Sequence, residues 1–524
     1  MITSRRGAAL LLLLPLLASP APATAATTEI RATEEVPSTA RAITEPRAGS
    51  DLEDLGATAA TKTSASAEAT APIRFGPCPP DVGAGVQCGR LEVPRDHANP
   101  VGPRISLALS RIPASGTPQE HRGALLVNPG GPGDPGLDYA ASKRAKLPEG
   151  VRRAYDVVGF DPRGVGRSAP VDCGPTGGLF ERPRPDPVPR DHAAELSYLD
   201  GLGGIAEDCR RNSGALLPHL STVETARDMD LVRQALGEPV LNYLGVSYGT
   251  YLGAAYAAEF PHRTGRMVLD SAVGPDDWHR FDVRQGFAML AQRDVLFDWI
   301  AAHPELGLGT DRAAVRSSYL AARARLPIGE LGPDEFDRAA YEALSRTERW
   351  EPFARGLAEV LRTGDGSALL PDAGDRNSEA ALRAVKCADS PRPSRAEVLG
   401  SVRALRAADP QPVLTGLEAA VCAFWSPPRE TARLGHPAMP PVLITQAAHD
   451  PTTPLDGTVR LRARMPGARM AVLDDGYSHG AFASQRNACL DGTAERYLLT
   501  GQLPAADVHC AGPGLPATSA AARP

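Results

Sequence analysis

Aromatic residues and net charge are both scarce in this sequence. Phe, Trp and Tyr make up 5% of the 524 residues, so no aromatic platform for stacking against a carbohydrate is indicated. The formal net charge at pH 7 is -6, which is mild for this length. It gives no reason to expect a nucleic acid or an anionic membrane as a partner.

Motifs for cofactors and metals are also missing. The Gly-rich segment Asn128–Gly133 has neither the Lys nor the downstream acid that phosphate-binding loops need. The eight cysteines include no Cys-x-x-Cys pair, and no Cys/His cluster has the spacing of a zinc site. We therefore expect no cofactor and no metal ion.

The N-terminal apolar run, Ala8–Ala18, is too short to span a bilayer. It follows Arg5 and Arg6 and precedes Ala23-Thr24-Ala25, which is the order of a secretory signal peptide. The paired arginines also allow a twin-arginine signal, and no cysteine follows the cleavage site to carry a lipid anchor. We expect residues 1–25 to be a signal peptide and the protein to be secreted and extracellular.

An even number of cysteines fits an exported protein, because an oxidising compartment favours disulfides. Spacing alone does not fix which cysteines pair. We expect sequential pairing, in which each bridge closes a short or medium loop at the edge of the fold: Cys78–Cys88, Cys173–Cys209, Cys387–Cys422 and Cys489–Cys510.

Residues 26–71 are rich in Ala, Thr, Ser and Glu and lack apolar periodicity, which predicts a flexible pro-segment or linker. Short apolar runs then recur, at 91–93, 105–112, 123–128, 155–160, 240–246, 266–270, 441–445 and 469–473. Helical stretches separate these runs, and most runs end in a loop rich in Gly, Pro or Asp. The pattern predicts a mostly parallel sheet with helices on both faces and a ligand site at the carboxyl ends of its strands.

Strand signals vanish between residues 274 and 429. Helical patterns dominate there, for example at Phe287–Ala302, Arg338–Arg349 and Pro352–Leu361. We interpret this region as a helical cap inserted after the sixth strand, which divides a core into residues 72–273 and 430–512. The Pro- and Ala-rich residues 513–524 are expected to be a disordered tail.

The most specific signal is Gly245-Val246-Ser247-Tyr248-Gly249, a G-x-S-x-G sequence between a strand-like and a helix-like run. In that setting a sharp turn exposes the hydroxyl of Ser247 as a nucleophile. The amide of Tyr248, at the helix N-terminus, then faces the negative charge that develops on the substrate oxygen. The alternative is a serine in an ordinary strand-to-helix turn, since G-x-S-x-G also arises by chance.

A Gly-rich loop after an early strand supplies the second oxyanion donor in the α/β-hydrolase fold. Asn128–Gly133 has that position, and its glycines let an amide point inward without a side chain in the way. We expect the amide of Gly131 to be the donor, with Gly130 as the second candidate. A plain turn is the alternative, because Pro and Gly are common in loops.

The same fold orders its catalytic residues along the chain as serine, acid and histidine. His479 follows the last strand-like run and is the preferred base, whereas His509 looks like part of a disulfide-bound tail and His449 directly precedes the acid candidate. The preferred acid is Asp450, because its loop immediately precedes the strand of the histidine. Asp270, after the preceding strand, is the rival.

Together these motifs resemble the exported tripeptidyl aminopeptidases of actinobacteria, relatives of the proline iminopeptidases. The resemblance is carried by VNPGGPG (127–133), YDVVGFDPRGVGRS (155–168), YLGVSYGTYLG (243–253), HDPTTP (449–454) and SHG (478–480). It implies an α/β-hydrolase core, a helical cap and a triad of Ser247, Asp450 and His479. It also implies that the substrates are peptides with a free N-terminus, from which short peptides, often tripeptides, are released.

One part of the sequence departs from this family. The family often continues NPGGPG with Gly-Ser-Gly, but here Asp134-Pro135-Gly136 follows. We hypothesise that Asp134 pairs with the α-ammonium group of a substrate. A solvated loop aspartate is the alternative, and Asp276 and Asp277 are further candidates for the same role. The departure leaves the peptide preference open.

Three functions compete. An aminopeptidase that forms an acyl-enzyme on Ser247 is the favoured one. A secreted esterase or lipase with the same triad is the second, since both chemistries pass through the same kind of tetrahedral intermediate; a carboxylate that binds an amine would distinguish them. A catalytically inactive binding protein is the third, but it should lack a triad residue and all three are present.

Overall fold

The computed structural model describes residues 71–518 except 84, 175–180, 373 and 410–415, and these residues belong to one unit, Glu68–Pro524. The expected signal peptide and all of the expected pro-segment or linker except residue 71 lie outside the described residues. Among the residues that are described, no helix combines the length and the apolar character needed to cross a membrane.

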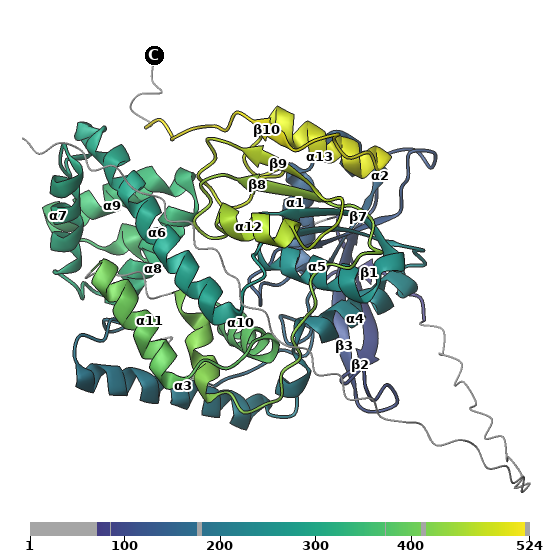
Figure 1. The fold of residues 1–524 in the computed structure, drawn as a ribbon, viewed down its shortest axis with the longest axis horizontal. Coiled ribbons are helices and arrows are strands. Elements are labelled where there is room, and N and C mark those ends of the chain that lie inside the picture. The colour runs from purple at the N-terminus through teal and green to yellow at the C-terminus, as the bar shows by residue number, and fades with distance from the viewer. Residues whose placement is uncertain (1–70, 84, 175–180, 373, 410–415, 519–524) are drawn as a thin grey trace, which may run out of the picture. The chain divides into compact units, whose positions relative to one another are not determined.

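A single ten-stranded sheet runs through the described part of the chain (Figure 1). Its strands are β1 (Gly76–Pro77), β2 (Gln87–Pro94), β3 (Arg104–Ile112), β4 (Ala124–Asn128), β5 (Asp156–Phe160), β6 (Leu241–Val246), β7 (Thr264–Asp270), β8 (Leu443–Ala447), β9 (Arg469–Leu473) and β10 (Val508–Cys510). They lie in the order β1-β2-β3-β5-β4-β6-β7-β8-β9-β10. Pairs among β1, β2, β3 and β5 are antiparallel and all others are parallel, so the predicted mostly parallel sheet is confirmed.

Both faces of the central strands are apolar, because successive residues of a strand point to opposite faces. On β4, Leu125 packs in one apolar cluster and Leu126 in another. The first cluster contains residues of α1 (Leu137–Lys146), α2 (Glu149–Ala154) and α13 (Ala488–Thr500). The second contains residues of α4 (Thr222–Ala235) and α5 (Tyr248–Glu259). Helices therefore cover both faces, as the sequence predicted.

Six α-helices lie between β7 and β8 in the described part of the chain and gather beside the sheet in Figure 1. They are α6 (Trp278–Ala301), α7 (Arg312–Arg323), α8 (Pro333–Ser345), α9 (Trp350–Thr363), α10 (Arg376–Asp389) and α11 (Arg395–Ala408). Phe297, Phe336 and Trp350 are fully buried in an apolar cluster that these helices share. The three stretches predicted as helical are helical, and all three helices begin before the predicted stretches do.

The structure differs from the sequence interpretation in how this helical part is built. It follows β7 because the two-residue strand β1, too short to leave a sequence pattern, precedes the first predicted strand. In addition, α3 (His192–Ser213) comes before Ser247 in the chain but packs with the inserted helices. Leu199 of α3 lies in their apolar cluster, and Glu195 accepts a hydrogen bond from Arg403 of α11 at 2.9 Å.

The predicted disordered tail is wrong for residues 513–518. The indole N–H of Trp299 donates to the carbonyl of Pro516 at 2.6 Å, and the hydroxyl of Thr518 donates to Glu305 at 3.1 Å. Thr518 is buried. The composition suggested disorder because it offers little apolar surface, but these anchors use a backbone carbonyl and a hydroxyl. Residues 519–524 lie outside the described residues.

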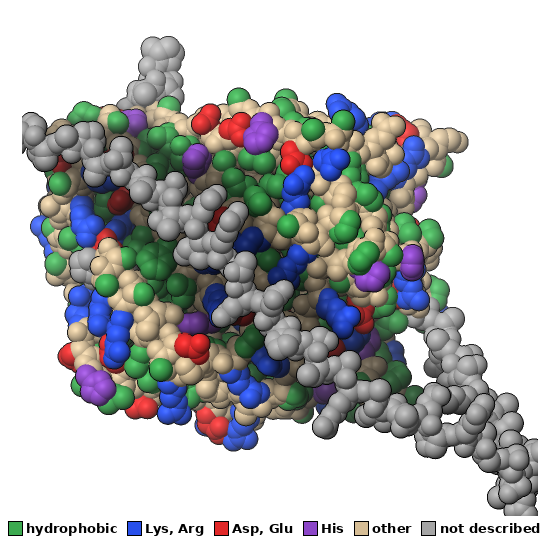
Figure 2. Space-filling view, viewed as in Figure 1, with side chains coloured by type: hydrophobic (Ala, Val, Ile, Leu, Met, Phe, Trp, Pro, Cys, Tyr) green, Lys and Arg blue, Asp and Glu red, His purple; other side chains and the backbone are tan. Residues whose placement is uncertain are grey.

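Charged side chains of both signs are interspersed on the face shown in Figure 2. Many exposed cations of the inserted helices pair with an acid on the same helix. Examples are Arg355 with Glu351 and Arg362 with Glu359, each at 2.6 Å. Such pairs contribute about 0.3–0.5 kcal/mol each to helix stability, so these cations stabilise the helix on which they lie.

The four expected disulfides are all present: Cys78–Cys88, Cys173–Cys209, Cys387–Cys422 and Cys489–Cys510. The Cys387–Cys422 bridge joins α10 to the 3-10 helix η8 (Glu418–Phe424). These two elements are 35 residues apart at their cysteines, and the bridge ties them together within the helical part.

Replacing both Cys387 and Cys422 by Ala should lower the free energy of unfolding by about 2–4 kcal/mol. The bridge closes a long loop and so restricts the unfolded chain strongly, and its removal lets that loop move freely. Removing Cys78 and Cys88 should cost less, since that bridge spans a sequence separation of only 10. Urea unfolding of the two double variants measures both losses. A larger loss from the Cys78–Cys88 variant would contradict the prediction.

Candidate active site

The backbone at Ser247 is strained. Ser247 lies between β6 and α5 with φ 57° and ψ -126°, a region that non-glycine residues rarely adopt. Such a conformation costs about 1–3 kcal/mol, so the surrounding structure must hold it. The amide of Ser247 donates to the carbonyl of Asp270 at 3.0 Å, and the carbonyl of Ser247 accepts from the amide and hydroxyl of Thr250 at 2.8 and 2.6 Å. This is the sharp turn that a nucleophilic serine needs.

The glycines on either side of Ser247 are required by close approaches. A Cβ atom on Gly245 would lie 2.3 Å from the carbonyl oxygen of Gly249. A Cβ atom on Gly249 would lie 2.8 Å from the side-chain oxygen of Asn128. Both distances are shorter than real Cβ contacts, so any larger residue would force the turn open.

The Gly-rich loop after β4 rests directly against this turn. A Cβ atom on Gly130 would lie 2.6 Å from the carbonyl oxygen of Val246 and 3.1 Å from the amide nitrogen of Tyr248. The amide of Gly130 donates to Asn128 Oδ1 at 3.1 Å. That hydrogen bond occupies Gly130, the second candidate for the oxyanion donor, so it does not fill that role.

Gly131 and Tyr248 are better placed as donors. Gly131 lines the same cavity as Ser247. Tyr248 is the first residue of α5, and the amide of a first helical residue has no acceptor within its own helix. Its hydroxyl shares a hydrogen bond of 2.6 Å with the buried Thr222, which fixes the start of the helix.

The structure joins the predicted base to the predicted acid. His479 Nδ1 and Asp450 Oδ2 are 2.8 Å apart. The Asp450 side chain is fully buried, whereas that of His479 keeps 12% of its surface exposed. The amide of His479 donates to the carbonyl of Ser345, the last residue of α8, at 2.8 Å. The inserted helices therefore contact the backbone of the histidine directly.

Asp450 is held as a carboxylate by its neighbours. Its Oδ1 accepts from the amides of Thr452 and Thr453, at 2.9 and 3.1 Å, and its Oδ2 accepts from the Thr453 hydroxyl at 2.9 Å. Burial acts to raise the pKa of Asp450, but the charge and hydrogen bond of His479 and the bonds from Thr453 outweigh it, so the pKa is lowered. A charged acid beside the imidazole fixes its tautomer and stabilises its protonated form.

The rival acid, Asp270, contacts the loop of His479 rather than its ring. Asp270 Oδ1 accepts from the amides of Ala481 and Phe482, at 2.9 and 3.1 Å. The buried ammonium of Lys143 lies 3.9 Å from Asp270 Oδ2 and donates to the carbonyl of Phe482 at 2.7 Å. The sequence showed an acid at a strand end but not this role, in which Asp270 and Lys143 together position the loop that follows His479.

The other two histidines weighed from the sequence have different partners. The His449 ring stacks on Tyr477 with centroids 4.4 Å apart. His509 Nδ1 lies 2.7 Å from Asp474 Oδ1 on an exposed part of the surface. Neither lines the cavity that contains Ser247.

Ser247 and His479 line one cavity of about 640 Å³. The sheet end, α1 and the inserted helices all contribute to its wall. Its acidic side chains are Asp134, Glu342, Glu379 and Glu418, and its basic ones are Lys143, Lys146, Arg338 and Arg346. The volume is in the range of sites that bind small molecules or short peptides.

Three of the four carboxylates are already neutralised by the protein. Glu379 of α10 meets Arg338 at 3.0 Å and Arg383 at 2.9 Å. Burial acts to raise the pKa of Glu379, but these two guanidinium groups outweigh it and lower the pKa to about 2. Glu418 of η8 lies 2.8 Å from the ammonium of Lys386, and Glu342 pairs with an arginine outside the cavity.

Asp134 differs from these three. Its exposed side chain has no ion pair or hydrogen bond with any described residue, and it lies close to Gly131. Although this side chain reaches solvent, the protein atoms around it in the cavity wall desolvate it in part and raise its pKa, and the charges of Glu379 and Asp375 raise the pKa further. The other acids weighed from the sequence lie outside the cavity: Asp276 pairs with Arg460, and Asp277 caps α6.

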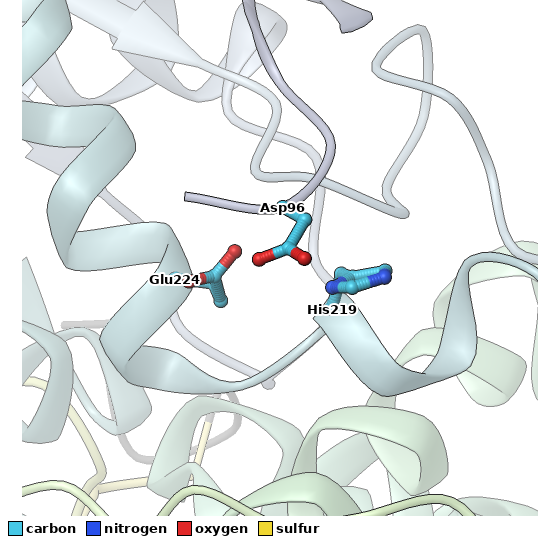
Figure 3. Close-up of side chains that lie close together, drawn as sticks. All are labelled: Asp96, His219 and Glu224. Carbon is cyan, nitrogen blue, oxygen red and sulfur yellow. The ribbon is translucent and has the colours of Figure 1, made fainter. Parts of the chain in front are cut away.

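A second cluster of titratable groups lies outside the cavity. Figure 3 shows Asp96, His219 and Glu224 pointing toward one another, with candidate ligand atoms within 4.8 Å. Glu224, however, already accepts from Arg163 and Arg227, each at 2.9 Å. Two guanidinium groups on the same carboxylate oppose a bound cation. We therefore interpret this cluster as part of the polar surroundings of the buried Arg163 and not as a metal site.

Comparisons with known proteins agree with this geometry. The sequence model of a family described as "alpha/beta hydrolase fold" matches residues 123–483. A tripeptidyl aminopeptidase of Streptomyces lividans is 38% identical over an alignment of 453 residues that covers 81% of this chain and 84% of that protein. A serine protease Hip1 of Mycobacterium tuberculosis is 30% identical over 84% of this chain and 91% of its own. A carboxylesterase B of the same organism is 31% identical over 81% and 86%.

Asp270→Asn should lower kcat by about 10- to 100-fold with little change in KM, since misplacing the predicted base, His479, is costly while the substrate contacts remain. The variant leaves Lys143 buried beside a neutral partner and so should also lose stability. Lys143→Met in the same chain removes that unpaired charge. The double variant should regain stability without regaining kcat; recovery of both together would mean that Asp270 acts through stability alone.

Proposed function

The chain belongs to the α/β-hydrolase family, and we propose that it is a secreted serine aminopeptidase that releases short peptides, chiefly tripeptides, from free N-termini. It is a serine hydrolase of the group that includes tripeptidyl aminopeptidase and serine protease Hip1. The finer proposal rests on the contents of the cavity, which provide both a catalytic apparatus and an unneutralised carboxylate.

In this proposal the hydroxyl of Ser247 attacks the scissile carbonyl while His479 takes its proton. The oxyanion of the tetrahedral intermediate accepts hydrogen bonds from the amides of Tyr248 and Gly131. Collapse of the intermediate breaks the C–N bond, and His479 returns the proton to the leaving amine. An acyl-enzyme ester on Ser247 remains, and water activated by His479 hydrolyses it. Asp450 keeps the imidazole in the required tautomer throughout.

The observation that carries the exopeptidase assignment is the free carboxylate of Asp134 in the cavity wall. The protein around Asp134 and the charges of Glu379 and Asp375 raise its pKa, and a bound ammonium group, which favours the carboxylate, would oppose these effects. A peptide with a free N-terminus brings such a group, whereas an internal segment of a protein does not. The sequence departure at Asp134 thus becomes a recognition element for the N-terminus.

Secretion is supported by two independent features. The N-terminal sequence has the order of a signal peptide, and the structure holds four disulfides, which persist in oxidising compartments.

A secreted esterase is the second candidate, favoured by the 31% identity to a carboxylesterase B. Ester and amide hydrolysis use the same nucleophile, base and oxyanion hole. They differ in what the cavity must recognise, because a simple ester carries no ammonium group for Asp134.

A matched pair of tripeptide amide substrates, one with a free N-terminus and one acetylated, separates the two candidates. We expect cleavage of the free form only, and none by Ser247→Ala, because acetylation removes the charge that Asp134 binds. Product length from a longer free peptide, read by mass spectrometry, should correspond to released tripeptides. Hydrolysis of simple esters without any amide cleavage would instead establish the esterase.

Asp134→Asn should raise KM for the free tripeptide substrate about tenfold, which corresponds to the loss of a charged contact of about 1.4 kcal/mol. Hydrolysis of an uncharged ester should stay the same or rise, because the replaced carboxylate lies near the oxyanion loop. Asp138→Asn, an exposed acid at the start of α1 that does not line the cavity, is the matched control. Equal KM values for both variants and the unmodified enzyme would show that Asp134 does not contribute to substrate recognition.

A further inference from the structure

Three cations lie close to the loop of His479 in the cavity wall. Arg346 follows Ser345, whose carbonyl accepts the amide of His479 at 2.8 Å. Lys143 donates to a carbonyl three residues beyond His479, and Lys146 is the last residue of the same helix, α1. Lys143, Lys146 and Arg346 all line the cavity. The cavity wall next to His479 therefore carries positive charge.

Two of these cations lack an effective partner within the protein. Lys143 is compensated by Asp270. Lys146, which is exposed, forms no hydrogen bond or ion pair with the described residues. Arg346 approaches an acid only at Glu348, at 3.8 Å, with side chains that are 47% and 65% exposed; that contact is the single ion pair of Arg346 in the described part of the chain. An exposed pair at that distance contributes little.

Elsewhere on the inserted helices many exposed cations pair with an acid of their own helix, as Arg355 and Arg362 do, and charges of both signs are interspersed on the face shown in Figure 2. Lys146 and Arg346 are each close enough to Lys143 to affect its pKa. Burial lowers the pKa of Lys143, and the charges of Lys146 and Arg346 lower it further. A group of like charges that the protein leaves unneutralised, in a cavity wall, favours an anionic ligand.

The chemistry of the reaction indicates which part of a substrate meets this wall. His479 passes its proton to the leaving amine, so the leaving peptide must lie on the side of His479. A leaving fragment of one or a few residues ends in a free α-carboxylate. Carboxylates are bound by Lys as a point charge and by Arg through a bidentate fork.

We propose that Lys146 and Arg346 form a subsite for the α-carboxylate of the leaving peptide, so that the preferred substrates are short oligopeptides with both termini free. The inference rests on the proposed aminopeptidase function and adds a second anchor to it. Asp134, beside the oxyanion loop, takes the positive end of the substrate, and the basic wall beside His479 takes the negative end. The cavity thereby selects for peptides over folded proteins, whose C-terminus lies far from the cleaved bond.

The test compares tetrapeptides of one sequence with a free N-terminus and either a C-terminal carboxylate or a carboxamide. We expect kcat/KM to be about three- to tenfold higher for the carboxylate form, the range of one or two partly exposed charge contacts. Lys146→Ala combined with Arg346→Ala should bring that ratio close to one by lowering kcat/KM for the carboxylate form alone. High salt should reduce the wild-type ratio, because exposed charges are screened.

Two controls keep the result specific. Arg362→Ala removes an exposed cation of α9 that pairs with Glu359 and does not line the cavity, and it should leave the ratio unchanged. Lys146→Arg combined with Arg346→Lys keeps both charges and should retain most of the ratio. Cleavage of both tetrapeptides at equal kcat/KM by the wild type, or a ratio that survives the double alanine variant, would overturn the subsite while leaving the aminopeptidase standing. Cleavage of neither tetrapeptide would overturn the proposed function itself.

Discussion

The left-handed backbone at Ser247 is the constraint on which the rest of the site depends. The conformation is held by the carbonyl of Asp270 and by Thr250, and it is allowed only because no side chain occupies positions 245, 249 and 130. The same close approach that excludes a Cβ atom from Gly130 brings the Gly-rich loop against the start of α5. The strain at one residue thus fixes the relative position of the proposed nucleophile and both proposed oxyanion donors, and the buried sheet beneath supplies the rigidity to maintain it.

In the proposed mechanism the inserted helices act on the base, His479, as well as on the substrate. The backbone of His479 is bonded to Ser345 at the end of α8, while Asp270 and Lys143 hold the following residues from the opposite side. A shift of α8 would therefore move the imidazole as well as the cavity wall. The sheet and the helical part meet at the histidine, so the cavity wall proposed to recognise the substrate is mechanically linked to the imidazole proposed to transfer the proton.

Sequence reasoning succeeded where the signal is local and failed where it depends on contacts distant in the chain. The strands were recognisable because both faces are buried and leave continuous apolar runs. The turn at Ser247 was recognisable because its close approaches demand glycines at fixed spacing. The helices against which α3 packs, however, are distant in the chain, and the sequence of α3 does not reveal them. The contacts through which Asp270 holds the loop after His479 involve residues more than two hundred positions later. The tail at 513–518 was misjudged because its anchors are a backbone carbonyl and a hydroxyl, which composition does not reveal.

Charge at the oxyanion loop has a consequence for catalysis as well as binding. A carboxylate at Asp134, close to Gly131, opposes the negative charge that develops on the substrate oxygen, and this repulsion would slow the reaction if it were left uncompensated. In the proposed function, an ammonium group bound at Asp134 would cancel this repulsion. A substrate with a free N-terminus would then remove an electrostatic penalty from the transition state in addition to gaining a contact in the ground state. Under this arrangement the discrimination against blocked peptides and neutral esters is expressed in the rate of acylation, and a cavity that is otherwise suited to general ester and amide hydrolysis becomes selective for peptides that carry a positive N-terminus.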